Sequence, residues 1–115
     1  MSRYPEDYLR HILQETTFIL ETSQGLSEDN FYQDEVLRRA YVRSLEIIGE
    51  ATKNLPDDFR KQHSQLPWRR MAGMRDKLIH EYFGVDYEVV WDVVVNQIPD
   101  LHHKVEFLLK DMADE

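Results

Sequence analysis

The fold of this chain is decided by residues 74–82, which have the sequence MRDKLIHEY. We interpret them as the end of an amphipathic helix that begins near Trp68. Gly84 follows as a residue suited to end that helix, and Asp86 is suited to cap the next one. The pattern Arg-x4-His-x-Tyr brings three residues capable of phosphate chemistry into eight positions.

Arg75 breaks the pattern of this helix. At helical spacing from residue 68, one apolar stripe contains Trp68, Met71, Ala72, Leu78, Ile79 and Tyr82. Arg75 falls in the middle of it. A guanidinium keeps its charge, so it is costly on a core-facing stripe unless it is paired or meets an anion. Such a break in patterning is expected at a functional site.

Length and composition exclude several classes of protein. The chain has 115 residues, enough for one compact domain, and we expect a single domain over residues 1–115. It has no Cys, which excludes disulfides and thiolate metal sites. The polar segment Met1–Arg10 lacks the apolar core of a signal peptide, and no apolar run approaches a membrane span. We therefore expect a soluble cytoplasmic protein.

The charge is unevenly distributed. The net charge is −8, which argues against broad, non-specific binding of nucleic acid. Between Arg60 and His80, however, six basic residues stand against the single acid Asp76, so this window carries +5 and the remainder −13. The window could bind a polyanion locally, or its charges could be the solvated faces of two short helices.

Hydrophobic periodicity predicts helices throughout. The expected elements are long helices at Pro5–Ser23, Gln33–Lys53 and from Trp68 to the motif, a short helix near 57–62, and a last helix from Asp86 that Pro99 kinks or breaks. Asn96 is a candidate cap for the continuation after the break. The Val-rich run 93–95 favours a strand by propensity, but its helical context overrides this. The prediction is an all-α, antiparallel four-to-five-helix bundle.

The second long helix contributes two features. Gly49 permits close approach by a neighbouring element. The face opposite the apolar stripe carries charges of both signs, at Arg43, Glu46, Glu50 and Lys53. This line is either a solvent face tied by weak ion pairs or the source of a counter-charge for Arg75.

The motif residues suit acid–base chemistry on a phosphate. On an ideal helix Asp76 and His80 share a face, so the carboxylate can hold the imidazole as a general acid or base. Arg75 and His80 are about 140° apart around the axis, and they converge only if the arginine bends round or the helix loosens before Gly84. Tyr82 lies on the same side as Arg75.

Metal-free cleavage of a phosphodiester needs a cation for the developing charge and a proton shuttle. Arg, His and Tyr can supply both, with a second copy across a two-fold axis completing the site. The alternative is a structural ion pair between Arg75 and a Glu of the second helix, with His80 an ordinary residue. A guanidinium bonded to a carboxylate of its own subunit, far from any second copy, would overturn the nuclease prediction.

The chain resembles the HepT-like HEPN family along nearly its whole length. The resemblance is carried by residues 45–51, 66–69, 73–83, 85–86 and 90–92. It implies a helical homodimer whose two R-x4-H motifs face each other across a cleft that cuts RNA without metal or other cofactor. Arg75 and His80 would be the catalytic pair, assisted by Asp76.

HepT-like proteins are toxins of toxin–antitoxin pairs. The resemblance implies a cognate nucleotidyltransferase of the MntA type, which silences the toxin by transferring AMP to Tyr82. The added negative charge beside Arg75 would neutralise it and block RNA.

Two other functions stay open. One is a non-catalytic HEPN dimer that docks a nucleotidyltransferase and presents a nucleotide or substrate to it. The other is a histidine metal site built from His11, His102 and His103. The second is disfavoured because neighbouring residues on a helix point about 100° apart.

Overall fold

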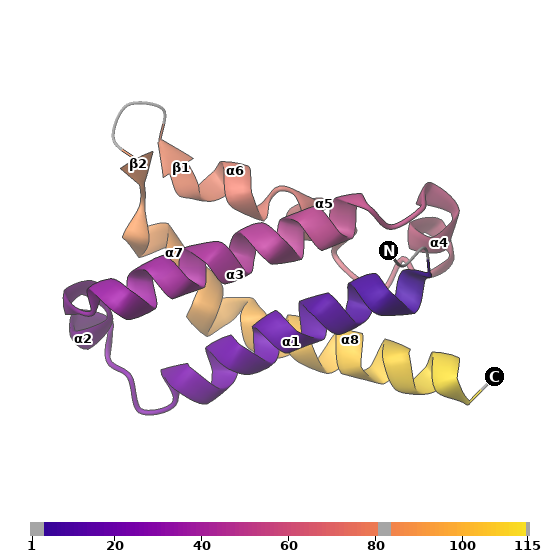
Figure 1. Cartoon of the computed structure of the whole chain (residues 1–115), viewed down its shortest axis with the longest axis horizontal. Helices are drawn as coiled ribbons and strands as arrows, with labels where there is room; N and C mark the ends of the chain where they lie inside the picture. Colours follow the sequence, from indigo (N-terminus) through magenta and orange to yellow (C-terminus); the bar gives the residue numbers. More distant parts are fainter. Residues whose placement is uncertain (1–3, 81–83, 115) are drawn as a thin grey trace.

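Three long helices frame the molecule: α1 (Pro5–Ser23), α3 (Glu35–Lys53) and α8 (Ile98–Ala113). In this computed structural model, which describes residues 4–80 and 84–114, α1 packs against both α3 and α8 (Figure 1). Helix α1 begins as its sequence predicts, with Pro5 in its first turn beside the acids Glu6 and Asp7. The buried residues of α1 recur at helical spacing: Leu9, Ile12, Thr16 and Ile19.

Five shorter helices complete the described part of the chain. They are α2 (Glu28–Gln33), α4 (Asp57–Gln62), α5 (Trp68–Ala72), α6 (Met74–Leu78) and α7 (Tyr87–Asn96). Asp34 starts α3 by accepting a hydrogen bond from the backbone N–H of Leu37 at 3.0 Å. The predicted all-α bundle is confirmed.

The core contains an aromatic cluster between α2, α3 and α7. The ring of Phe31 stacks on that of Tyr41, with centroids 5.6 Å apart, and on that of Trp91, with centroids 5.2 Å apart. Phe31 and Tyr41 are fully buried, and the Tyr41 hydroxyl is hydrogen-bonded to Thr22 Oγ1 at 2.7 Å. Burial raises the pKa of Tyr41, an effect that the hydrogen bond between Tyr41 and Thr22 partly offsets.

The prediction of one long helix from Trp68 to the end of the motif is wrong. Helix α5 ends at Gly73, α6 is a short helix, and the backbone then enters the strand β1 (Ile79–His80). This strand pairs antiparallel with β2 (Gly84–Val85), so that Ile79 lies opposite Val85 and His80 opposite Gly84. A glycine in a helix interior costs about 1 kcal/mol, which favours the break at Gly73.

Gly84 is placed differently from its predicted role as a helix-ending residue. It lies in β2 with a φ of 77°, a conformation that glycine adopts without strain. The backbone N–H of Asp86 then donates to the Leu78 carbonyl at 2.8 Å, which joins the end of α6 to the start of α7. Asp86 caps α7 as predicted, because its Oδ1 accepts from the N–H groups of Glu88 and Val89.

The break near Pro99 is confirmed, with a different cap. Helix α7 ends at Asn96, and α8 begins at Ile98 with Pro99 in its first turn, where a missing N–H is harmless. The prediction that Asn96 caps the continuation is wrong, because its side chain donates to Asp92 at 2.7 Å and Gln97 holds the cap position. The Val-rich run 93–95 is helical, as expected.

Candidate functional site

Arg75 lies on α6, where the short helices cross α3. Gly49 of α3 makes this crossing close: a Cβ there would lie 3.4 Å from the Ala72 carbonyl oxygen and 4.0 Å from the Arg75 backbone nitrogen. A neighbouring element does approach Gly49, as predicted, at distances that an added Cβ would meet as ordinary van der Waals contact. The backbone carrying Arg75 is held directly against α3, beside the charged line of that helix.

The guanidinium of Arg75 faces two carboxylates. Its Nε lies 3.5 Å from Oε2 of Glu46 on α3, and its Nη1 lies 3.9 Å from Oδ1 of Asp76. Both distances exceed the 2.7–2.9 Å of a charge-assisted hydrogen bond. The side chains are partly exposed, 49% for Arg75, 30% for Glu46 and 72% for Asp76. Arg75 is thus held by loose ion pairs at the surface, with donors left for an anion.

The predicted placement of Arg75 on a buried apolar stripe is wrong. Met74 and Leu78 are 2% and 1% exposed and face the core, whereas Arg75 is exposed. Leu78, counted on the same stripe, is buried as expected, so the error concerns Arg75, whose side chain lies at the surface while Met74 faces the core. Two alternatives were open for the charged line of α3: a solvent face, or a source of counter-charge for Arg75. The structure shows the second, because Glu46 pairs with Arg75.

The predicted helical pairing of Asp76 with His80 is also wrong. Helix α6 ends at Leu78, so His80 lies on a strand and the four-residue spacing no longer puts the two on one face. Arg75 and His80 were expected to converge only if the arginine bends round or the helix loosens before Gly84. The second condition is met, because α6 ends at Leu78. The His80 side chain and all of Tyr82 lie outside the described residues, so their roles stay predictions.

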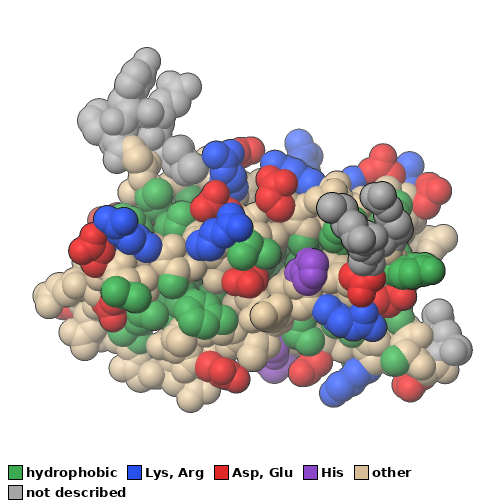
Figure 2. Space-filling model, viewed as in Figure 1, with side chains coloured by type: hydrophobic (Ala, Val, Ile, Leu, Met, Phe, Trp, Pro, Cys, Tyr) green, Lys and Arg blue, Asp and Glu red, His purple; other side chains and the backbone are tan. Residues whose placement is uncertain are grey.

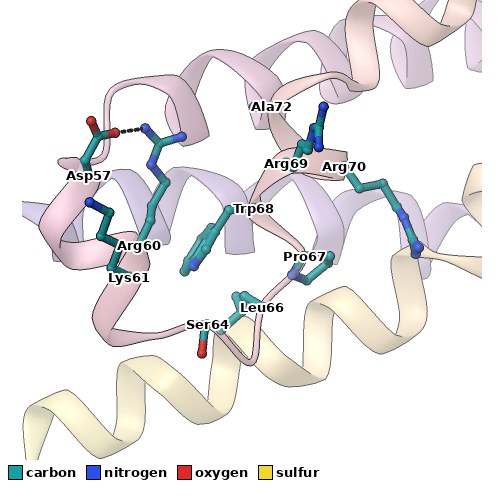
Figure 3. Close-up of a pocket in the computed structure, with 10 residues that line it drawn as sticks. All are labelled: Asp57, Arg60, Lys61, Ser64, Leu66, Pro67, Trp68, Arg69, Arg70 and Ala72. Atoms are coloured by element: carbon teal, nitrogen blue, oxygen red, sulfur yellow. Dashed lines mark hydrogen bonds and ion pairs between the residues drawn. The ribbon is translucent and has the colours of Figure 1, made fainter.

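Sequence reasoning did not find a groove between α4 and α5, with a volume of about 900 Å³ (Figure 3). We call it the α4–α5 groove, and its lining residues are Asp57, Arg60, Lys61, Ser64, Leu66, Pro67, Trp68, Arg69, Arg70 and Ala72. Trp68 is 8% exposed, and its indole N–H donates to the His63 carbonyl at 2.8 Å. The available signal was the sequence Leu66-Pro67-Trp68 directly before two arginines.

Elsewhere the charges are mixed. On the face seen in Figure 2, acidic and basic side chains are interspersed over the helices. The pairs Arg10–Asp7 and Arg39–Glu35 are exposed and close, at 2.9 and 2.7 Å. Pairs of this kind contribute little to stability.

The histidines considered for a metal site have structural neighbours. Nδ1 of His102 is hydrogen-bonded to Oγ1 of the buried Thr16 at 2.9 Å, and its ring meets that of His103 edge-on. His11 lies on the exposed side of α1, its ring against Tyr8. Among residues 4–80 and 84–114, no three side chains capable of binding metal lie together.

The family described as "Ribonuclease HepT-like" matches residues 12–108. The chain belongs to this family. The resemblance inferred from the motif and its flanking segments is therefore confirmed.

Relatives of the HepT-like chain are described as ribonucleases. The present chain is 56% identical to a "Putative RNase" of Caldanaerobacter subterraneus subsp. tengcongensis, over 92% of this chain and 95% of that protein. It is 47% identical to the "Probable ribonuclease HepT" of Thermococcus cleftensis, over 96% of this chain and the whole of that protein. A "Putative RNase" of Methanocaldococcus jannaschii is 44% identical, over 94% and 89% of the two chains.

No solved structure matches the chain significantly. Within the described residues, no helix combines the length and apolarity that a membrane crossing needs.

Proposed function

We propose that this chain is a metal-independent endoribonuclease, the toxin of a HEPN/minimal-nucleotidyltransferase toxin–antitoxin system acting in the cytoplasm. Membership of the ribonuclease HepT-like family supports RNA as the substrate. The structural observation that carries the proposal is Arg75, a surface guanidinium loosely paired with Glu46 and Asp76.

Arg75 supplies the cation of the proposed reaction. Neither of its carboxylate contacts is short enough for a strong hydrogen bond, so the fork of the guanidinium can turn to a phosphate and bind it in bidentate fashion. Fixed positive charge at the place where negative charge develops in the transition state is worth several kcal/mol. Asp76 is exposed beside Arg75 and assists in the proposal by orienting polar groups of the substrate.

His80 is the proton shuttle in this proposal. It follows Arg75 by five residues, and the backbone between them leaves the helix at Leu78 to pair with β2. An imidazole titrates near neutral pH, so it can take a proton from the 2′-OH or give one to the leaving oxygen. One Arg and one His do not complete a site, so the proposal places two motifs in a composite cleft of a homodimer.

Tyr82 is the proposed regulatory residue. A cognate MntA-type nucleotidyltransferase would transfer AMP from ATP to its hydroxyl: the phenolic oxygen loses its proton and bonds to the α-phosphorus, the α–β phosphoanhydride bond breaks, and pyrophosphate leaves. The phosphate adds a negative charge a few residues from Arg75. A covalently held anion competes with RNA for that guanidinium at a high effective concentration, which would silence the enzyme.

One observation favours the second candidate function, a non-catalytic HEPN dimer that presents a nucleotide or substrate to the nucleotidyltransferase. Glu46 already partners Arg75 within the same chain, as a purely structural cation would require. The ion pair is long and partly exposed, however, so displacing it costs about 1 kcal/mol or less. The ribonuclease therefore stays the preferred function.

The deciding experiment is RNA cleavage in excess chelator by the purified, unmodified protein. We expect the wild type to cut and His80→Ala to lose at least a hundredfold in rate, the lower range for one general acid–base group. His103→Ala is the matched control, because His103 is an exposed histidine on α8, outside the motif. Intact RNA with all three proteins would favour the binding function.

A further inference from the structure

The α4–α5 groove carries positive charge that the proposed active site does not use. Arg60 is neutralised by an ion pair with Asp57 within the groove. In contrast, Lys61, Arg69 and Arg70 form no ion pair with any residue of the described ranges 4–80 and 84–114. Arg43, Lys53 and Lys77 also form no ion pair among the described residues. The distinguishing feature of Lys61, Arg69 and Arg70 is therefore that they line one groove of a chain whose net charge is −8.

The three cations are spread around the groove. Lys61 comes from α4, and Arg69 and Arg70 come from α5 (Figure 3). Arg69 and Arg70 extend in different directions from α5, and Arg70 points toward α8. Arg69 and Arg70 are exposed, so they can reach an anion without a large desolvation cost. Charges spread in this way suit an extended polyanion better than a single phosphate ion.

The floor of the groove is apolar. Leu66, Pro67 and the edge of Trp68 line it, and only a small part of Trp68 is exposed. A ribose or the face of a base can lie on this floor while the cations contact phosphates, the combination that single-stranded nucleic acid uses. A base can stack only weakly on the nearly buried indole of Trp68. Contacts to phosphates therefore supply most of the binding free energy, and binding does not depend on the RNA sequence.

The groove adjoins the proposed active site along the chain. Ala72 lines the groove, Gly73 alone separates α5 from α6, and Arg75 is the second residue of α6. Both helices pack on α3 (Figure 1). Arg75 therefore follows the last lining residue of the groove, Ala72, by three positions.

We propose that the α4–α5 groove binds the single-stranded backbone of the RNA substrate beside the scissile linkage, through Lys61, Arg69 and Arg70. This inference rests on the proposed ribonuclease function for the identity of the polyanion. It adds a site that holds RNA without taking part in the chemistry.

The test is RNA binding by fluorescence anisotropy in a His80→Ala background, so that cleavage does not interfere. Each phosphate contact to a single strand contributes about 0.7 to the slope of log K against log salt concentration. Removing two contacts with Arg69→Ala/Arg70→Ala should reduce the slope by about 1.4. Between about 50 and 200 mM salt, the parent should then lose about sevenfold more affinity than the double variant.

Arg10→Ala/Lys110→Ala is the matched control, because it removes the same charge from exposed residues of α1 and α8. We expect the parent slope from it. Equal slopes for the two double variants would overturn the proposal. So would unchanged RNA affinity of Arg69→Ala/Arg70→Ala together with weakened binding of the nucleotidyltransferase, because the groove would then be a protein-docking surface.

Cleavage assays separate this inference from the proposed function. With His80 restored, Arg69→Ala/Arg70→Ala should raise KM more for an RNA of about 16 nucleotides than for one of about 4, the range of single-strand footprints. An equal change in KM for both lengths would contradict the groove while leaving the ribonuclease intact. If no protein cuts RNA, the anisotropy comparison still decides whether the groove binds it.

Discussion

The pair Arg75–Glu46 allows the catalytic and structural explanations of Arg75 to be separated. Its Nε–Oε2 distance is 3.5 Å, and the two side chains are 49% and 30% exposed. Exposed pairs contribute about 0–1 kcal/mol, and screening by solvent keeps this pair within that range. For a domain of this size, a loss of 1 kcal/mol lowers Tm by about 4 °C. Arg75→Ala should therefore fold normally and melt no more than about 4 °C below the wild type.

The effect on cleavage should be far larger. Loss of one group that stabilises developing charge costs about 10²–10³ in rate, so Arg75→Ala should fall at least a hundredfold. Glu46→Gln keeps the shape of the side chain and removes the charge, and it should retain cleavage within about tenfold. Arg39→Ala is the matched control, because it breaks another exposed ion pair, Arg39–Glu35, outside the motif.

A double-mutant cycle of Glu46→Gln and Arg75→Ala completes this test, with urea unfolding and cleavage rate as the two measurements. The coupling energy in stability should be about 1 kcal/mol or less. A loss of 3–5 kcal/mol on Arg75→Ala, as for a broken buried pair, would refute the reasoning and assign Arg75 a structural role. Loss of cleavage in Glu46→Gln as large as in Arg75→Ala would refute direct action of Arg75 on RNA.

Three further predictions concern other residues. Co-expression with the cognate nucleotidyltransferase should add adenylate mass at Tyr82; tandem mass spectrometry that places the adduct elsewhere, or finds it in Tyr82→Phe, would contradict this. Gly49→Ala should be tolerated, because its Cβ makes only ordinary contacts and helix propensity improves by about 1 kcal/mol, whereas Gly49→Val should lower the free energy of unfolding in urea. Burial raises the pKa of Tyr41 in the fold, so above about pH 10 the unfolded chain loses this proton first and stability falls as pH rises. Tyr41→Phe should lose less stability than the wild type between pH 8 and 11; an equal loss would show that Tyr41 is not responsible. A hydrogen bond to Glu28 raises the pKa of Tyr32 to about 12, so a residual decline should persist in that variant.

Helices whose apolar residues kept one period over several turns were predictable from sequence. The span predicted for α1 is the one observed, because its first turn, its buried face and its ending residue all agree. Asp86 was recognised as a cap for the same reason, since a carboxylate before a run of helix-forming residues has few other roles. The break near Pro99 followed from covalent geometry.

The candidate site was harder to predict, because the helix is interrupted at Gly73 and the backbone becomes extended after Leu78. Propensity alone makes one glycine a modest penalty, so the apolar period appeared to continue through it. The pairing of Ile79 with Val85 is a contact between residues six positions apart, which helical periodicity does not encode. Arg75 was selected for a buried position that it does not occupy, and its role in the site stays a prediction.

The groove could not be read from the pattern, because its cations come from two helices whose relative placement depends on the turn between them. Lys61 and Arg69 are eight positions apart, with no periodicity connecting them. The concentration of basic residues over 60–80 and the sequence Leu66-Pro67-Trp68 before two arginines pointed to this region, without showing a groove. One side of the groove, α5, is placed by its packing against α3.

Because a carboxylate of α3 already lies against the guanidinium of Arg75, an arriving anion exchanges one electrostatic partner for another. The net attraction gained in that exchange is small, so chloride and other simple ions have little power to displace Glu46. A phosphate or carboxylate that binds the guanidinium of Arg75 in bidentate fashion gains short hydrogen bonds. Glu46 does not make such bonds, because its oxygen lies 3.5 Å from Nε. In the proposed function, Glu46 would thus compete with the substrate for Arg75, and the shape of the anion, more than its charge, would be the basis of selection.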